Sequence, residues 1–161
     1  MSTTRPGVAS SIPFEVTGRA FWTADRVAAA LAPVAAGLLP GGPREFAAVQ
    51  TDTRTIVPGA LFVALRGERF DAHDFLRTAV EAGAIALVVD DPARAAGLGV
   101  PVYPVRDTRA AYGALAHFRR RAWTKPVIAV GGSNGKTSTK ELLAAMLGGA
   151  YRVHATAGNL N

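Results

Sequence analysis

The 161-residue sequence contains no cysteine. This absence excludes a disulfide framework, a cysteine nucleophile and thiolate metal sites, and it is consistent with a reducing cytoplasm. Long apolar runs are also missing, because the longest, residues 27–39, is interrupted by Pro33 and Gly37. It is far shorter than the roughly 20 residues that cross a bilayer. Residues 1–14 lack the charged start and apolar core of a signal peptide. We therefore expect a soluble, cytoplasmic protein without a membrane span.

Acidic residues are fewer than basic ones, and the formal net charge is +6. Part of the excess lies in Arg119, Arg120 and Arg121, with Lys125 close behind. A basic balance is typical of nucleic-acid or membrane binding, but it also suits a protein whose ligands are nucleotides. No nucleic-acid motif accompanies it, so we expect no nucleic-acid partner. The arginine run is better interpreted as the solvated end of a helix, where the dipole favours cations.

One glycine-rich stretch carries the clearest chemical signal. The apolar residues 127–130 lead into Gly131, Gly132, Ser133, Asn134, Gly135, Lys136, Thr137 and Ser138. Because the glycines have no side chains, successive backbone N–H groups can surround a phosphate, and the helix that follows adds the positive end of its dipole. Lys136 would contact the β- and γ-phosphates, and the Thr137 hydroxyl would be a ligand for Mg²⁺.

This stretch departs from the full P-loop pattern at one position. Five residues before Gly135, where that pattern has a glycine, stands Val130. The alternative interpretation is an ordinary strand-to-helix turn that happens to contain Lys-Thr. A strand before the loop and a helix after it are the context that phosphate binding requires, and the sequence predicts both.

Strands and helices alternate along the chain. We expect strands at residues 46–50, 60–65, 84–89, 100–105, 127–130 and 151–155. We expect helices from Thr23 to Ala32, from Asp74 to Gly83, after an Asp107 cap, and after Gly135. The helix after Asp107 would turn Ala111, Leu115, Phe118 and Ala122 inward. This alternation predicts an α/β fold with a mostly parallel sheet.

The best domain boundary lies near residues 123–126, where a basic helix ends and a phosphate-binding βαβ unit begins. We expect a poorly ordered leader at residues 1–20 and a small N-terminal α/β substrate domain at residues 21–123. Residues 124–161 would form the first βαβ unit of a P-loop ATPase domain. Such a domain needs several more strands and an acidic Mg²⁺ ligand, so we expect it to be truncated here.

Several segments together resemble the Mur ligases, the ATP-dependent amino-acid ligases of peptidoglycan synthesis. The resemblance rests on Thr51–Arg54, Pro58–Gly67, Phe70–Phe75 and the shortened loop Gly131–Thr137. Residues 67–75, 138–141 and 158–161 are most similar to the MurF-type members, which add D-Ala-D-Ala to UDP-MurNAc-tripeptide.

The resemblance implies a three-domain enzyme that is a monomer when complete. Its N-terminal domain would bind the UDP end of the precursor, its central domain ATP and Mg²⁺, and its C-terminal domain D-Ala-D-Ala. ATP would phosphorylate the terminal carboxylate of the precursor, and the amine would attack the acyl phosphate. The ATP site would be residues 131–138, with Lys136 and Thr137 as the catalytic pair. The precursor would contact Thr53, Arg54, Arg66, Gly67, His73 and Asn159.

Simpler interpretations remain open for several of these residues. Residues 52–54 are equally well explained as a strand-end turn, although Arg54 or Arg66 could bind a diphosphate with its two-pronged guanidinium. His73 could be a contact at a helix N-terminus, His117 an exposed side chain and His154 a structural one.

Other functions also remain open. The chain could belong to another Mur ligase or to a ligase similar to folylpolyglutamate synthetase, or it could be a non-catalytic nucleotide-sugar-binding module. As an isolated chain it is not expected to complete the ligation, since later Mg²⁺ ligands and the dipeptide-binding domain are missing from the sequence.

Overall fold

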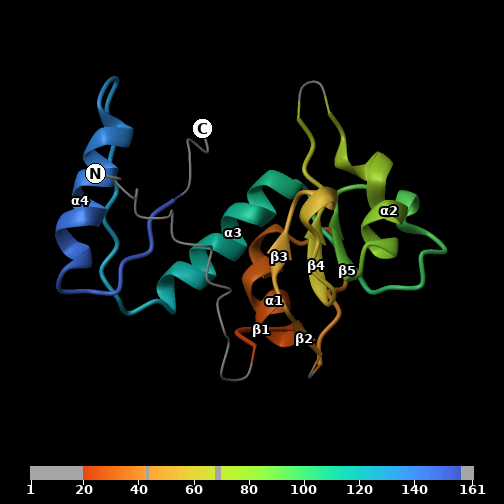
Figure 1. Cartoon of the computed structure of the whole chain (residues 1–161). Coiled ribbons are helices and arrows are strands. Elements are labelled where there is room, and N and C mark those ends of the chain that lie inside the picture. Colours follow the sequence, from red (N-terminus) through yellow and green to blue (C-terminus); the bar gives the residue numbers. More distant parts are fainter. Residues whose placement is uncertain (1–19, 43, 68–69, 157–161) are drawn as a thin grey trace, which may run out of the picture. The chain divides into compact units, whose positions relative to one another are not determined.

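The computed structural model describes residues 20–42, 44–67 and 70–156 (Figure 1). The chain divides into two compact units, Met1–Ala122 and Trp123–Asn161. Apart from Ala20, the expected leader at residues 1–20 lies outside the described residues, as does the predicted precursor contact Asn159.

The first unit is built on a four-stranded parallel sheet. Its strands, in spatial order, are β3 (Val49–Gln50), β4 (Ala60–Val63), β5 (Ala84–Val89) and β6 (Val102–Pro104). The α/β fold and the parallel sheet predicted from the sequence are confirmed, although β4 and β6 are shorter than predicted.

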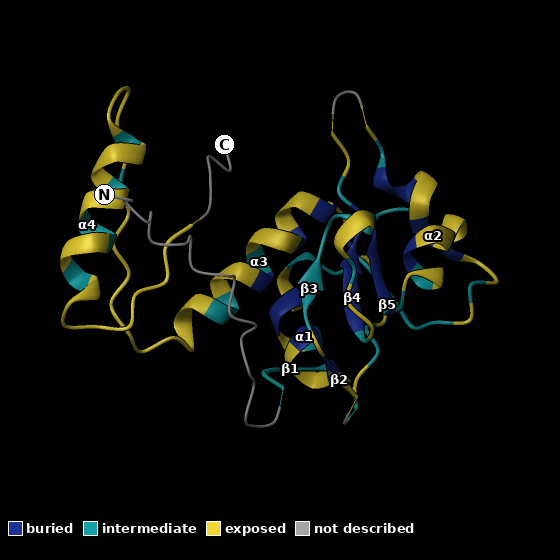
Figure 2. Cartoon of the chain, viewed as in Figure 1, coloured by how far each residue is buried: buried dark blue, intermediate teal, exposed yellow. Residues whose placement is uncertain are grey.

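Helices cover both faces of this sheet (Figure 1). Helices α1 (Ala24–Leu31) and α3 (Thr108–Arg121) pack on one face, and α2 (Leu76–Glu81) packs on the other. Along β4, Leu61 and Val63 point into the first apolar cluster, whereas Phe62 points into the second. All three are fully buried (Figure 2), as is typical of strands in a parallel sheet.

Two helices begin as the sequence predicts. The Thr23 hydroxyl caps α1 by accepting a 3.3 Å hydrogen bond from the backbone N–H of Arg26. Asp107 caps α3, where its carboxylate accepts from a backbone N–H at 2.7 Å. Leu115 on α3 is buried as expected, but Ala122 is exposed. The prediction for Ala122 was wrong because α3 ends at Arg121 and Ala122 already follows the helix.

The helical segment after β4 begins earlier than predicted. A 3-10 turn, η3 (Ala72–Phe75), precedes α2, and it is capped by Asp71 rather than by Asp74. The Asp71 carboxylate accepts a 2.9 Å hydrogen bond from the backbone N–H of His73. Asp74 instead forms an ion pair with Arg94. The sequence offers two aspartates at this turn, and Arg94 pairs with both of them.

The strand predicted at residues 46–50 is two short strands. Strand β2 (Glu45–Phe46) pairs antiparallel with β1 (Trp22–Thr23), whereas β3 joins the parallel sheet. Between them, the backbone N–H of Ala47 donates to the Gly59 carbonyl at 2.9 Å. The chain therefore changes partners at Ala47, which a single apolar run in the sequence does not reveal.

The second unit contains one helix and, among its described residues, no strand. Helix α4 (Lys136–Gly148) follows the glycine loop as predicted. Residues 127–130 and 151–155 are irregular, so the prediction of strands there was wrong. A strand is stable only when a neighbour pairs its backbone groups, and the described residues of this unit supply none. His154 is correspondingly exposed rather than part of a strand.

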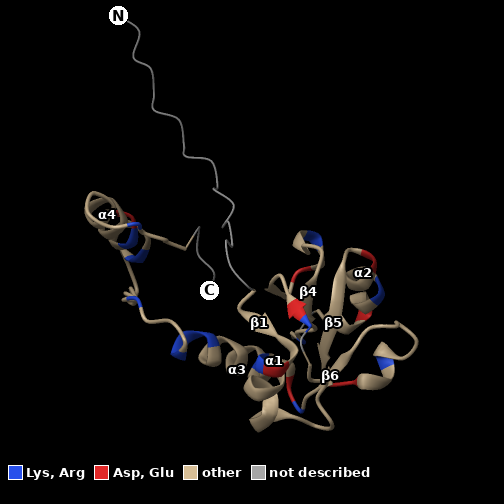
Figure 3. Cartoon of the chain, turned by 90° about the horizontal axis from the view of Figure 1, so that it is seen from below, with Lys and Arg blue, Asp and Glu red and all other residues tan. Residues whose placement is uncertain are grey.

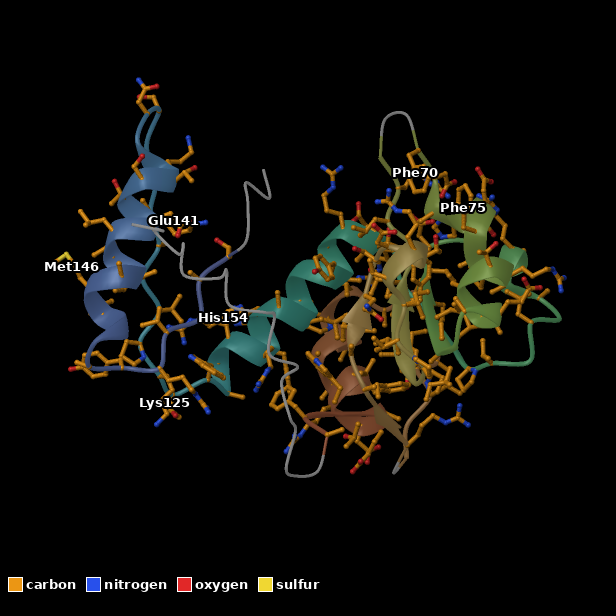
Figure 4. All side chains as sticks on the ribbon, viewed as in Figure 1. Phe70, Phe75, Lys125, Glu141, Met146 and His154 are labelled. Atoms are coloured by element: carbon orange, nitrogen blue, oxygen red, sulfur yellow. The ribbon has the colours of Figure 1, made fainter. Side chains whose placement is uncertain are left out.

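Apolar side chains of the second unit face solvent. Ile128, Leu142 and Met146 are each at least 60% exposed, and Figure 4 shows Met146 pointing outward from α4. Across the described residues, no helix is both long and apolar enough to cross a membrane.

Replacing Leu87 with alanine tests whether β5 is the centre of the first unit's core. Leu87 is 0% exposed, so its removal leaves a cavity and should lower the free energy of unfolding by about 2–5 kcal/mol. Leu38 of the same unit is 94% exposed, and Leu38→Ala should change it by less than about 0.5 kcal/mol. Urea denaturation followed by circular dichroism measures both, and equal effects would contradict the assignment of the core.

Candidate functional site

Charged residues follow each strand of the parallel sheet. Asp52 comes after β3, Arg66 after β4, Asp90 directly after β5, and Asp107 after β6. Because the strands are parallel, their carboxyl ends lie at one edge of the sheet, where open α/β sheets bind their ligands. The fold therefore brings together charges that are far apart in the sequence.

A pocket of about 310 Å³ opens at this edge. Among the described residues it is lined by Arg66, Asp90, Asp107, Thr108 and Arg109. We call it the sheet-edge pocket. Two guanidinium groups and two carboxylates give it balanced charge, so it offers hydrogen-bond donors and acceptors to the same ligand. Such a lining suits a ligand that combines anionic groups with hydroxyl or amide groups.

A cluster of charged side chains lies beside this pocket and is built around Asp71. One carboxylate oxygen of Asp71 lies 2.7 Å from Nδ1 of His73. The other accepts from Arg94 Nη1 at 2.8 Å and lies 3.3 Å from Arg66 Nε. Arg66 also reaches Asp90, with Nη2 3.1 Å from Oδ1. These five residues, the Asp71 cluster, tie together the segments that follow β4 and β5.

The surroundings of Asp71 stabilise its charged form. Partial burial acts to raise its pKa, but the backbone N–H and ring of His73 and the Arg94 guanidinium outweigh burial. Together they lower the pKa of Asp71 to about 2. Asp71 is therefore a permanent negative charge at neutral pH, and it can hold two arginines in place.

His73 lies inside the Asp71 cluster rather than in the pocket. Its side chain is 0% exposed, and Nε2 lies 3.3 Å from the backbone nitrogen of Asp90. The geometry favours the interpretation of His73 as a contact at the start of a helical segment over direct contact with a ligand. Any influence on a ligand would pass through the two aspartates beside it.

The turn after β3 has a structural explanation of its own. Asp52 caps the 3-10 turn η2 (Thr53–Thr55) by accepting from the backbone N–H of Arg54 at 3.0 Å. The Arg54 guanidinium returns to the Asp52 carboxylate, with Nη2 2.6 Å from Oδ2. Hydrogen bonds from Arg54 lower the pKa of Asp52 to about 2. Arg54 is 85% exposed, so it remains accessible to a ligand although it is already paired.

Of the residues predicted to contact the precursor, Arg66 lines the sheet-edge pocket, whereas Thr53, Arg54, Gly67 and His73 do not. The sequence prediction did not include Asp90, Thr108 or Arg109. Asp90 could have been found, since it directly follows the most apolar predicted strand. Arg109 lies in the first turn of a helix, and no sequence signal separates it from an ordinary surface arginine.

The glycine loop, residues 131–135, has a backbone that suits a phosphate. Gly132 and Gly135 have φ angles of +143° and +74°, which favour glycine. Gly135 is the N-cap residue of α4, and no side chain caps the helix. Lys136 folds back so that Nζ donates to the Gly132 carbonyl at 2.8 Å. The loop thus combines an uncapped helix N-terminus with an ammonium group, the two features that bind phosphate in such loops.

The arginines at the end of α3, blue in Figure 3, differ in their exposure. Arg120 and Arg121 are exposed, as predicted for a solvated helix end. Arg119 is half-buried, with its guanidinium carbon 4.0 Å from the centre of the Phe21 ring. This cation–π contact ties the helix end to the start of the first unit. His117 is exposed, as predicted.

Comparison with known families identifies both parts of the chain. Residues 45–120 match the Mur ligase family, catalytic domain, and residues 130–161 match the Mur ligase middle domain. The chain belongs to the Mur ligase family.

Two relatives with the same name illustrate the similarity. A UDP-N-acetylmuramoyl-tripeptide–D-alanyl-D-alanine ligase of Synechocystis is 50% identical over 111 residues, which are 69% of this chain and 24% of the relative. The ligase of that name from Escherichia coli is 49% identical over 125 residues, covering 78% and 27%. The chain therefore spans about a quarter of the length of the curated relatives it matches.

Solved structures of MurF proteins also resemble this chain. A crystal structure of MurF from Acinetobacter baumannii has a TM-score of 0.73 and 36% identity, covering 87% of this chain and 30% of that one. MurF of Thermotoga maritima, solved in complex with ADP, has a TM-score of 0.60 and 31% identity, covering 70% and 26%.

Removing the charge of Asp71 should change the pH dependence of stability. The folded-state pKa of about 2 lies below the ordinary value of 3.8, so the charge stabilises the fold above pH 4. This contribution, about 2 kcal/mol, is lost as the pH falls from about 4 to about 2. Asp71→Asn should therefore be less stable at pH 7 and flatter in that acidic range, as measured by urea denaturation at a series of pH values.

Glu81→Gln is the matched control, because Glu81 is exposed at the end of α2. It should keep the acid-range slope of the unchanged chain. If Asp71→Asn kept that slope too, the charged carboxylate of Asp71 would not stabilise the fold as its contacts indicate.

Proposed function

We propose that this chain supplies two binding sites to a UDP-N-acetylmuramoyl-tripeptide–D-alanyl-D-alanine ligase. The first unit binds the UDP end of the peptide precursor, and the second holds the phosphates of ATP. The observation that carries the proposal is that one chain contains both a charge-balanced pocket at the sheet edge and a glycine loop that precedes a helix. The reaction is taken from the names of the two relatives described above.

The sheet-edge pocket suits the precursor in its chemistry. A nucleotide sugar carries diphosphate oxygens, which accept hydrogen bonds, and hydroxyl and imide groups, which donate them. Arg66 and Arg109 can donate to the diphosphate, and Asp90 can accept from the donors. The same carboxyl edge of the sheet also carries Thr53, Arg54 and Gly67, which follow β3 and β4. We propose that these residues contact more distant parts of the precursor.

The glycine loop suits the triphosphate of ATP. No side chain caps the N–H groups at the start of α4, which leaves them available to an anion, and Lys136 can exchange its bond to the Gly132 carbonyl for one to a phosphate oxygen. Thr137 would hold Mg²⁺, which neutralises charge on the transferred phosphoryl group. Forming an acyl phosphate requires that the γ-phosphate be held in one orientation, and residues 131–138 would provide that restraint.

A non-catalytic nucleotide-sugar-binding module is the second candidate, and the difference between the two units favours it. The first unit contains two buried apolar clusters, whereas helix α4 buries none of its residues. In this candidate, the precursor site works alone and the glycine loop binds nothing.

Single substitutions should separate the two sites. Arg66→Ala should raise the dissociation constant for UDP-MurNAc-tripeptide about 10-fold or more, because it removes charge-assisted hydrogen bonds from the pocket. Lys136→Ala should leave that constant unchanged but abolish the binding of Mg-ATP. Isothermal titration calorimetry with the 161-residue chain measures both ligands.

Arg77→Ala is the matched control, since Arg77 is exposed on α2 and lies outside the pocket lining. It should bind both ligands as the unchanged chain does. Precursor binding without any Mg-ATP binding would favour the module, and equal losses of both ligands in each variant would contradict the division into two sites.

A further inference from the structure

His73 is buried between two carboxylates, an unusual environment for an imidazole. Nδ1 lies 2.7 Å from Oδ1 of Asp71, and Nε2 lies 3.2 Å from Oδ1 of Asp90. No three of the described histidine, aspartate and glutamate side chains converge as a metal site, so a metal ion does not explain this arrangement. The role of the ring must come from its hydrogen bonds.

The hydrogen bonds determine which nitrogen carries the proton. The backbone N–H of Asp90 points at Nε2 at 3.3 Å, and a backbone N–H can only donate. This contact assigns the acceptor role to Nε2 and the proton to Nδ1, where it would be donated to Asp71. The consequence for Asp90 is specific: its Oδ1, which is buried and has no hydrogen-bond partner among the described residues, is not bonded by the ring.

The Arg66 guanidinium bridges the same two carboxylates. Its Nε lies 3.3 Å from Asp71 Oδ2 and its Nη2 lies 3.1 Å from Asp90 Oδ1, close enough for an ion pair with each. If Nε2 carries no proton, Asp90 Oδ1 can pair with Arg66 alone. If Nε2 carried a proton, the ring could also donate a hydrogen bond to this oxygen. His73 and Arg66 thus share the same two carboxylate partners.

We propose that His73, as the neutral tautomer protonated on Nδ1, is a positioning residue that fixes Asp71 and Asp90 so that Arg66 is held in the sheet-edge pocket. Its importance for binding rests on the proposed precursor site. The positioning of Arg66 does not, because it is a property of the chain without ligand. The groups that face the ring and complete the arrangement are Asp71, Asp90, and behind them Arg66 and Arg94.

Nuclear magnetic resonance of the full 161-residue chain tests the proposal directly. Long-range ¹H–¹⁵N spectra should show Nδ1 of His73 protonated and Nε2 unprotonated, while exposed His117 serves as the internal control. The Arg66 Nε–H group should have an order parameter close to that of rigid backbone, about 0.85. A proton on Nε2 of His73, or a mobile Arg66, would overturn the proposal without any variant.

Two substitutions separate the two hydrogen bonds. His73→Asn places an amide donor near Nδ1 and keeps the bond to Asp71, whereas His73→Gln places an acceptor near Nε2 and keeps the bond to Asp90. Each should lower the Arg66 Nε–H order parameter below about 0.6 and weaken precursor binding several-fold. His117→Gln should do neither.

The outcomes distinguish this proposal from the proposed function. If the unchanged chain failed to bind precursor while Arg66 was ordered and became mobile in the variants, the positioning role would stand and the precursor site would fail. If Arg66 stayed ordered in a folded His73 variant, the positioning role would fail whatever the affinity.

Discussion

The carboxylate of Asp71 is the constraint on which the site depends. It caps the turn that begins the α2 segment, accepts from the ring of His73, and holds Arg66 and Arg94. Partial burial acts to raise its pKa, but the hydrogen bonds from His73 and Arg94 outweigh burial and lower the pKa to about 2. Because its partners come from the segments that follow β4 and β5, one side chain links the loops at the ends of both strands.

The parallel sheet brings the Asp71 cluster to the edge where the pocket opens. Parallel strands place their carboxyl ends at one edge, so Arg66, Asp90 and Asp107 meet there although they are separated along the chain. The strands β4 and β5, which lead into that edge, are buried on both faces. Charge on the pocket wall is balanced, which favours a ligand with both anionic and hydrogen-donating groups. The glycine loop differs from the pocket, because it presents backbone N–H groups and one lysine instead of a set of charged side chains.

The sequence predicted correctly those features of the structure that depend on residues close together in the chain. The α/β class, the caps Thr23 and Asp107 and the helix after the glycine loop could all be predicted, because each depends on neighbouring residues.

Predictions were wrong where partners distant in the sequence determine the structure. Asp71 rather than Asp74 caps its turn, although Arg94 pairs with both carboxylates, and residues 127–130 form no strand because the described part of their unit offers none to pair with. Arg109 was missed because only the fold brings it to the pocket. The aromatic pair Phe70 and Phe75, stacked at 5.2 Å and adjacent in Figure 4, was likewise invisible as a pair.

The carboxyl edge of the parallel sheet is the place where we expect the precursor to bind. Amide ¹H–¹⁵N spectra of the chain, recorded while UDP-MurNAc-tripeptide is added, test this expectation most directly. If the edge is the precursor site, the largest shifts should occur at Arg66, Asp90, Thr108 and Arg109. Shifts concentrated at the amino ends of the strands, near Ala60 and Ala84, would contradict it, as would a spectrum that stays unchanged at saturating precursor.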